Sequence, residues 1–79
     1  MNKTIQIKNT TYMITKIVTG GRYSDCAELE GPRGGIVRLL KFHENGAVRV
    51  LKINKRGMPY ASEDVWGEEA ATISEAAGL

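Results

Sequence analysis

The sequence predicts a mainly β fold of the α+β type, namely a small five-stranded antiparallel barrel or curved meander sheet with one C-terminal helix. Turn-forming pairs such as Asn9-Thr10 and Gly20-Gly21 recur about every ten residues. The segments between them are rich in Ile, Val, Thr and Tyr, the residue types that favour strands. Because a chain of 79 residues buries too little surface for two cores, residues 1–79 are expected to form a single domain.

Five strands are expected, over residues 3–8, 11–19, 23–30, 36–43 and 47–54. Asn45-Gly46, between the last two, is a preferred sequence for a two-residue type I′ turn. Such a turn would pair Leu40 with Leu51, and directly opposed residues share a face. We therefore predict that the core face is the one with the larger apolar side chains, Ile36, Leu40, Phe42, Leu51 and Ile53.

The other face of the same hairpin is too apolar for open water and too charged for a full core. Its members are Val37, Leu39, Lys41, His43, Val48, Val50, Lys52 and Asn54. The expected cover is a helix over residues 62–77, connected to the β body (residues 1–57) by residues 58–61. This helix would carry acidic side chains close to Lys41 and Lys52, although its acids could instead face outward and imitate phosphates.

Several residues predict this helix. Ser62 is a good N-cap, and acids follow it in the first turn. The apolar residues Trp66, Ala70, Ile73 and Ala77 fall on one helical stripe. Gly67, inside the first turns, is expected to cost up to ~1 kcal/mol relative to Ala. Trp66 and Ile73 are expected to supply most of the docking energy, and Trp66 is also a candidate anchor for a partner.

Charge is distributed unevenly along the chain. Residues 1–57 contain all 11 basic residues and four acids, a charge of +7, whereas residues 58–79 contain five acids and no Lys or Arg, a charge of −5. The net charge of +2 is therefore the sum of a basic body and an acidic tail. Separated charge of this kind suits electrostatic steering toward a charged partner.

In a meander, alternate turns lie at the same end of the sheet. The 9–10 turn, the 31–35 loop and the 55–57 turn would then form a basic loop rim, whose glycine-rich backbone could offer N–H groups to an anion. The candidate binding residues of this rim are Lys8, Arg33, Lys55 and Arg56, with Arg22, Lys41 and Lys52 as second choices. The five aromatic residues of the chain leave little material for a stacking platform.

Catalytic and cofactor chemistry is not expected. The single cysteine, Cys26, excludes an internal disulfide and, with the single histidine, His43, leaves a zinc site dependent on carboxylates. A Cys26–His43 nucleophile pair stays open, although a mid-strand cysteine is typical of packing. No phosphate-binding or metalloprotease motif is present. We expect a cytoplasmic protein that is not an enzyme, needs no cofactor or metal and does not bind a membrane.

Two functions fit these observations. The first is a small non-enzymatic binding module that contacts nucleic acid or a nucleoprotein through the basic loop rim. The alternative is a small inhibitor from a mobile genetic element such as a phage or plasmid, of the anti-defence, anti-CRISPR or anti-restriction type, which blocks a host protein by direct binding. A homo-oligomer formed by pairing of exposed strand edges is a third hypothesis.

Overall fold

The computed structural model describes residues 3–79, and within them six antiparallel strands precede one helix. Each strand pairs with the next in the chain, so that the sheet has the order β1-β2-β3-β4-β5-β6. The mainly β fold with a C-terminal helix is confirmed, with six strands in place of the predicted five. The elements are β1 (Thr4–Ile7), β2 (Thr10–Val18), β3 (Ser24–Glu30), β4 (Ile36–Phe42), β5 (Val48–Ile53), β6 (Pro59–Val65) and α1 (Gly67–Ala77).

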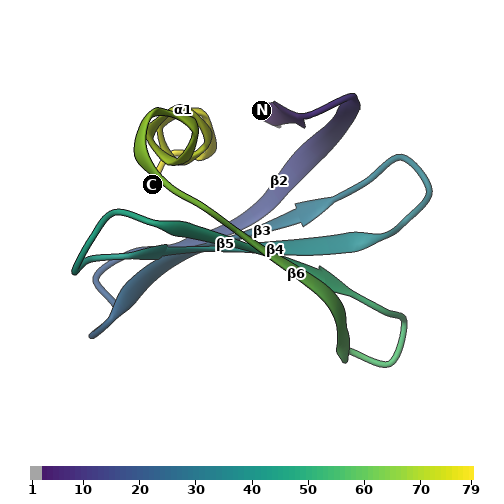
Figure 1. Ribbon diagram of the computed structural model, residues 1–79. Coiled ribbons are helices and arrows are strands. Elements are labelled where there is room, and N and C mark those ends of the chain that lie inside the picture. The colour runs from purple at the N-terminus through teal and green to yellow at the C-terminus, as the bar shows by residue number, and fades with distance from the viewer. Residues whose placement is uncertain (1–2) are drawn as a thin grey trace.

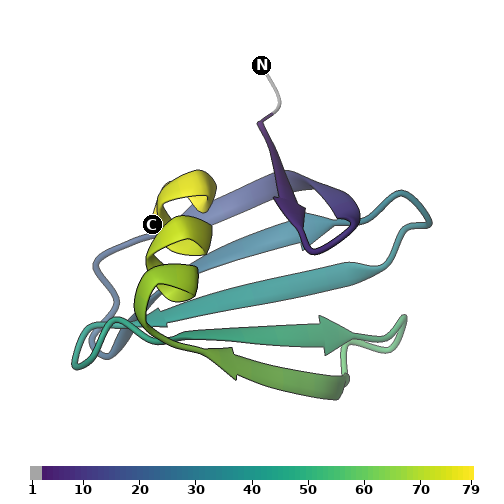
Figure 2. The ribbon, with the colours of Figure 1, turned by 45° about the horizontal axis from the view of Figure 1, so that its top comes forward.

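The sheet curls into a half-barrel, and α1 lies over its inner face (Figures 1 and 2). Two irregularities in register accompany the curl, one in β2 between Ile14 and Lys16 and one where β5 meets β6. Such bulges increase the local twist of a sheet. The curl brings the two edge strands close enough for Lys8, in the β1–β2 turn, to contact Glu63 of β6 at 2.9 Å.

The core lies between α1 and the inner face of the sheet. Leu29 and Leu39 have no exposed surface, and α1 contributes Ala70, Ile73 and Ala77. The remaining buried side chains of this cluster are Ile5, Ala27, Val37, Val48, Val50 and Val65. The helix thus covers the predicted face.

The prediction that the core lies on the face with the larger apolar side chains was wrong. Leu40, Phe42 and Leu51 lie on the outer face, where they are half-buried, and Ile53 is the member of the predicted core set that is buried. Burial follows the position of the helix and not the size of the side chains. Small helix residues such as Ala70 and Ala77 allow close approach to the sheet, so β-branched valines fill the space beneath them.

The β4–β5 connection is longer than predicted. Phe42 N–H donates to the Ala47 carbonyl at 2.9 Å, which leaves residues 43–46 as a four-residue loop. Leu40 consequently pairs with Arg49 and not with Leu51. Since this shift is two residues, every side chain keeps its predicted face. Gly46, at φ +70°, supplies the left-handed conformation that the loop needs.

The predicted connection (58–61) and the predicted first turn of the helix form β6. Ser62 therefore lies in a strand, opposite Leu51, and caps no helix. The N-cap of α1 is Trp66, which makes no side-chain cap hydrogen bond, and α1 begins at Gly67 with φ +62°. Within residues 3–79, no helix is long and apolar enough to cross a bilayer.

Candidate binding cleft at the basic end

The meander places three basic connections at one end of the sheet. They are the 8–9 turn, the 31–35 loop and the 54–58 turn, and they contain four basic and no acidic residues. The 19–23 and 43–47 loops lie at the opposite end. We call the first set the basic end; its cations are Lys8, Arg33, Lys55 and Arg56.

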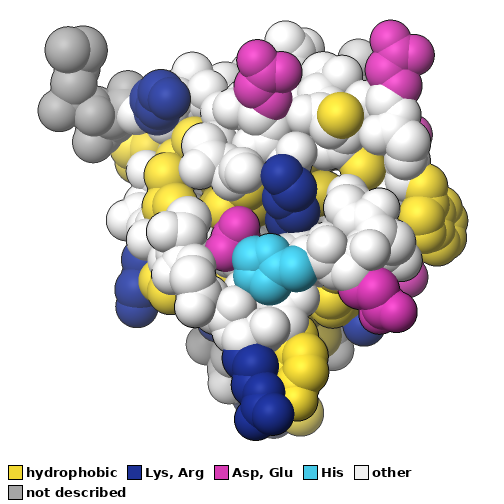
Figure 3. Space-filling model, turned by 90° about the vertical axis from the view of Figure 1, so that its left-hand side faces the viewer, with side chains coloured by type: hydrophobic (Ala, Val, Ile, Leu, Met, Phe, Trp, Pro, Cys, Tyr) yellow, Lys and Arg dark blue, Asp and Glu magenta, His cyan; other side chains and the backbone are white. Residues whose placement is uncertain are grey.

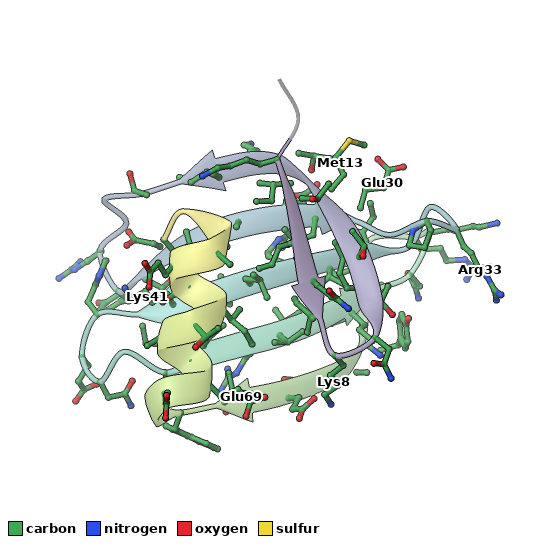
Figure 4. The ribbon with its side chains drawn as sticks, turned by 90° about the horizontal axis from the view of Figure 1, so that it is seen from above. Lys8, Met13, Glu30, Arg33, Lys41 and Glu69 are labelled. Carbon is green, nitrogen blue, oxygen red and sulfur yellow. The ribbon has the colours of Figure 1, made fainter. Side chains whose placement is uncertain are left out.

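Arg33 projects from a loop that is held by its own backbone. Gly31 N–H donates to the Gly35 carbonyl at 2.8 Å, and Gly34 N–H donates to the Gly31 carbonyl at 3.0 Å. A Cβ added at Gly31 would lie 3.3 Å from the ring of Tyr12, so the loop also packs closely on β2. Figure 4 shows Arg33 extending away from the sheet at this end.

The turn that carries Lys55 and Arg56 is fixed by Asn54. The Asn54 side-chain oxygen accepts hydrogen bonds from the N–H groups of Arg56 (2.9 Å) and Met58 (3.0 Å). Asn54 N–H in turn donates to the Met58 carbonyl at 2.9 Å. This local network leaves both basic side chains exposed on a defined backbone.

Lys8 differs from the other three cations because it already has a partner. Its ammonium group donates to Glu63 at 2.9 Å, and this hydrogen bond, with the charge of Glu63, raises the pKa of Lys8. Lys8 has φ +56° and is, within residues 3–79, the non-glycine residue with a positive φ. It links the β1–β2 turn to β6 and contributes little free charge to the basic end.

A cleft of about 630 Å³ opens at the basic end. Arg33 and Lys52 supply its positive charge, and Tyr12 of β2 and Tyr60 of β6 supply its aromatic surface. No Asp or Glu is among the lining residues. The others are Asn9, Thr10, Thr11, Gly31, Pro32, Gly35, Ile36 and Val37.

Tyr60 reaches the cleft because of the bulge in β6. Lys52 pairs with Ala61 and Ile53 pairs with Pro59, so Tyr60 is the extra residue between these pairs. Simple alternation from Ala61, which lies opposite inward-facing Lys52, would place Tyr60 on the outer face. Instead it lines the inner cleft beside Lys52 and is 65% exposed. Bulges commonly redirect a side chain in this way.

Of the second-choice residues, only Lys52 joins the cleft. Lys41 lies at the opposite end beneath α1, where its ammonium group donates to the Leu79 carbonyl at 3.3 Å (Figure 4). Arg22 is also at that end, with its guanidinium carbon 5.3 Å from the centre of the Tyr23 ring. Figure 3, which views this end, shows acidic and basic side chains mixed on one surface.

Within the described residues, the acidic segment pairs with Lys8 and leaves the other cations of the basic end without an ion pair. Figure 4 shows α1 crossing the strands at the end away from Arg33. Glu63 is engaged by Lys8, and Asp64 is engaged by Arg49 at 2.8 Å. Among residues 3–79, no carboxylate lies within 4.0 Å of the charged groups of Arg33, Lys52, Lys55 and Arg56.

Trp66 does not dock on the sheet. It is 62% exposed at the junction of β6 and α1, so the prediction that it supplies docking energy was wrong. Ala70, Ile73 and Ala77, which share its predicted stripe, are buried as expected. The exposed indole lies at the opposite end from the cleft.

Cys26 and His43 form no nucleophile pair. Cys26 lies on the outer face between Val18 and Leu40, and burial raises the pKa of its thiol. His43 Nε2 instead contacts the Gly21 carbonyl at 2.9 Å. Among the residues that the structure describes, no three His, Cys, Asp or Glu side chains are grouped so as to hold a metal ion.

Sequence reasoning missed both cleft tyrosines. Tyr12 falls in the predicted strand 11–19 and Tyr60 in the predicted connection 58–61, and neither position alone indicates a binding role. Comparison of the chain with protein-family models, with curated proteins and with solved structures finds no match.

Proposed function

We propose that this protein is a non-enzymatic module that binds nucleic acid, free or within a nucleoprotein, through its basic end. One observation carries the proposal: Arg33 and Lys52 line one cleft, Lys55 and Arg56 lie in a turn at the same end of the sheet, and none of the four has a carboxylate partner among the described residues. Cations placed in this way are available to phosphates, and each phosphate contact releases counterions. The helix, which carries three of the five acids of the tail, lies away from Arg33 (Figure 4), and its Glu69 lines a neighbouring pocket together with Lys52.

The proposal makes a quantitative prediction for salt. If these four cations each neutralise one phosphate of a single strand, the slope of log K against log[salt] is about −3. A rise from 50 to 200 mM salt should then weaken binding about 50-fold. Fluorescence anisotropy of labelled 12-nucleotide DNA and RNA strands measures this slope.

Charge reversal at the basic end tests which residues bind. Arg33→Glu with Arg56→Glu should abolish binding at 100 mM salt, because two attractive contacts become repulsive. The matched control is Lys3→Glu with Lys16→Glu, which changes the net charge equally at exposed positions outside the basic end. The control should retain binding within about threefold. Equal losses in the two double variants, or no binding of either strand by the wild type, would overturn the proposal.

A second candidate function is inhibition of a host protein by direct binding, as expected of a small protein from a mobile genetic element. The exposed indole of Trp66 favours it, because tryptophan is enriched at the centres of protein interfaces. A pull-down from a bacterial lysate treated with nuclease separates the two functions. A stoichiometric protein partner that survives nuclease and is lost with Trp66→Ala would support inhibition, and loss of all signal on nuclease treatment would argue against it.

A further inference from the structure

We infer that the cleft at the basic end holds an unpaired nucleotide, with its base stacked on Tyr60 and its phosphates held by Lys52 and Arg33. This inference rests on the proposed function and narrows it to single-stranded nucleic acid. It depends on three features of the cleft: the exposure of Tyr60, the fixed position of Tyr12, and the absence of acidic lining residues.

The two tyrosines come from strands that are far apart in the sheet. Three strands separate β2 from β6, so only the curl of the half-barrel brings Tyr12 and Tyr60 to one cleft. Tyr12 is half-buried, packs on the core and lies close to Gly31, which fixes its ring. Tyr60 is 65% exposed, so that its ring faces are open to a ligand.

The chemistry of the cleft matches one nucleotide of a flexible strand. An aromatic ring accepts any base by stacking, and nearby cations follow the phosphate backbone. Lys52 and Arg33 occupy the same cleft as Tyr60, and the hydroxyl and amide groups of Thr10, Thr11 and Asn9 supply hydrogen-bond partners. A cleft of about 630 Å³ lies in the range of sites for small organic ligands.

A duplex cannot use this cleft in the same way. Its bases are stacked on one another and paired, so their faces are not available to Tyr60 unless a nucleotide is flipped out at a cost. A duplex can therefore contact only the exposed cations of the basic end. The structure thus predicts two contributions to binding. Arg33 and Arg56 attract single strands and duplexes alike, and Tyr60 adds a preference for single strands.

The test compares a 12-nucleotide strand with the same strand annealed to its complement, as DNA and as RNA, by fluorescence anisotropy at 100 mM salt. The wild type should bind at least one of the single strands about tenfold or more tightly than its duplex. Tyr60→Leu should weaken binding of that strand by about 5- to 150-fold, the range for loss of one base–aromatic stack. Tyr60→Phe, which keeps the ring, should retain the preference.

Tyr23→Leu is the matched control, because Tyr23 is 70% exposed at the opposite end of the sheet. It should leave both affinities unchanged, and thermal unfolding should show that the Tyr60 variants remain folded. If the wild type binds the single strand and the duplex with equal affinity, and the Arg33→Glu/Arg56→Glu variant binds neither, this inference is overturned and the proposed function stands. An unchanged strand affinity in Tyr60→Leu would also overturn it, whereas no binding of any oligonucleotide would overturn both.

Discussion

At the scale of single residues, the backbone angle of Gly67 reverses a prediction from helix propensity. A helix with glycine at an interior position is expected to be less stable than the same helix with alanine there. Gly67, however, has φ +62° at the turn from β6 into α1, a conformation that L-residues adopt at a cost. No atom lies within 4 Å of a Cβ added there, so the requirement for glycine comes from the backbone and not from crowding.

Gly67→Ala should therefore lower the free energy of unfolding by about 1 kcal/mol. For a domain of this size, the corresponding fall in Tm is about 4–8 °C. Gly67→Asn should lower the free energy of unfolding by a smaller amount, because asparagine tolerates the left-handed region better than alanine. A higher Tm for Gly67→Ala, measured by circular dichroism, would show instead that Gly67 is an ordinary helical residue.

The Arg49–Asp64 pair gives the stability a defined dependence on pH. The Arg49 side chain donates two hydrogen bonds to Asp64, at 2.8 and 3.2 Å, and these hold the pKa of Asp64 below its ordinary value of 3.8. A carboxylate with a lowered pKa stabilises the folded state above its ordinary pKa, and this stabilisation is lost as the pH falls through the lowered pKa.

Asp64→Asn should accordingly destabilise the protein at pH 7 by a small amount, since the pair lies on the surface. The difference from the wild type should shrink toward zero as the pH falls below 4. Urea unfolding at intervals between pH 7 and pH 2 measures it. A difference that stays constant over this range would mean that the charge of Asp64 contributes nothing.

At the scale of elements, β4 distinguishes the two faces of the sheet within two neighbouring residues. Leu39 has no exposed surface under α1, and Leu40 is half-buried on the outer face. Removal of buried methylene groups costs both transfer free energy and cavity formation. The same substitution at the two positions therefore reports which face is the core.

Leu39→Ala should cost about 2–5 kcal/mol of unfolding free energy, and Leu40→Ala clearly less. Because a small domain can fail to fold after such a loss, Leu39→Val and Leu40→Val provide a milder pair. We expect about 1 kcal/mol at Leu39 and close to none at Leu40. Equal losses at both positions in chemical unfolding would contradict the observed core.

The sequence predicted the elements better than their boundaries and their packing. Alternation and turn residues located the first five strands, because both signals are local. The pattern of Ile36 to Phe42 could not tell which face forms the core, since both faces of β4 carry apolar side chains, although the face that α1 covers was predicted correctly. Likewise, Ser62 resembles a helix cap locally, but pairing with Leu51 in β5, a non-local contact, makes it part of a strand.

At the scale of the whole molecule, the candidate site combines features that are local with features that are not. The grouping of Arg33, Lys55 and Arg56 at one end follows from meander order, which the sequence predicts. The cleft itself follows from the curl of the sheet, which brings Tyr12 toward Tyr60, and no local pattern encodes this approach. The five aromatic residues suggested too little material for stacking, yet two of them line one cleft.

The charges that are separated along the chain are also separated in the folded molecule. The acidic tail does not neutralise the basic body uniformly, because Glu63 and Asp64 engage Lys8 and Arg49 and the helix lies toward the opposite end. The net charge of +2 therefore conceals an end of the molecule with free cations. We expect association with polyanions to begin at that end.

The most direct test of this account is a titration of ¹⁵N-labelled protein with a 12-nucleotide single strand, followed by amide chemical shifts. We predict that the largest changes fall in the 31–35 loop, in the 54–58 turn, and at Tyr12, Lys52 and Tyr60. The amides of α1 and of the 43–47 loop should change little. Changes centred on Trp66 and α1, with the basic end unaffected, would contradict the account.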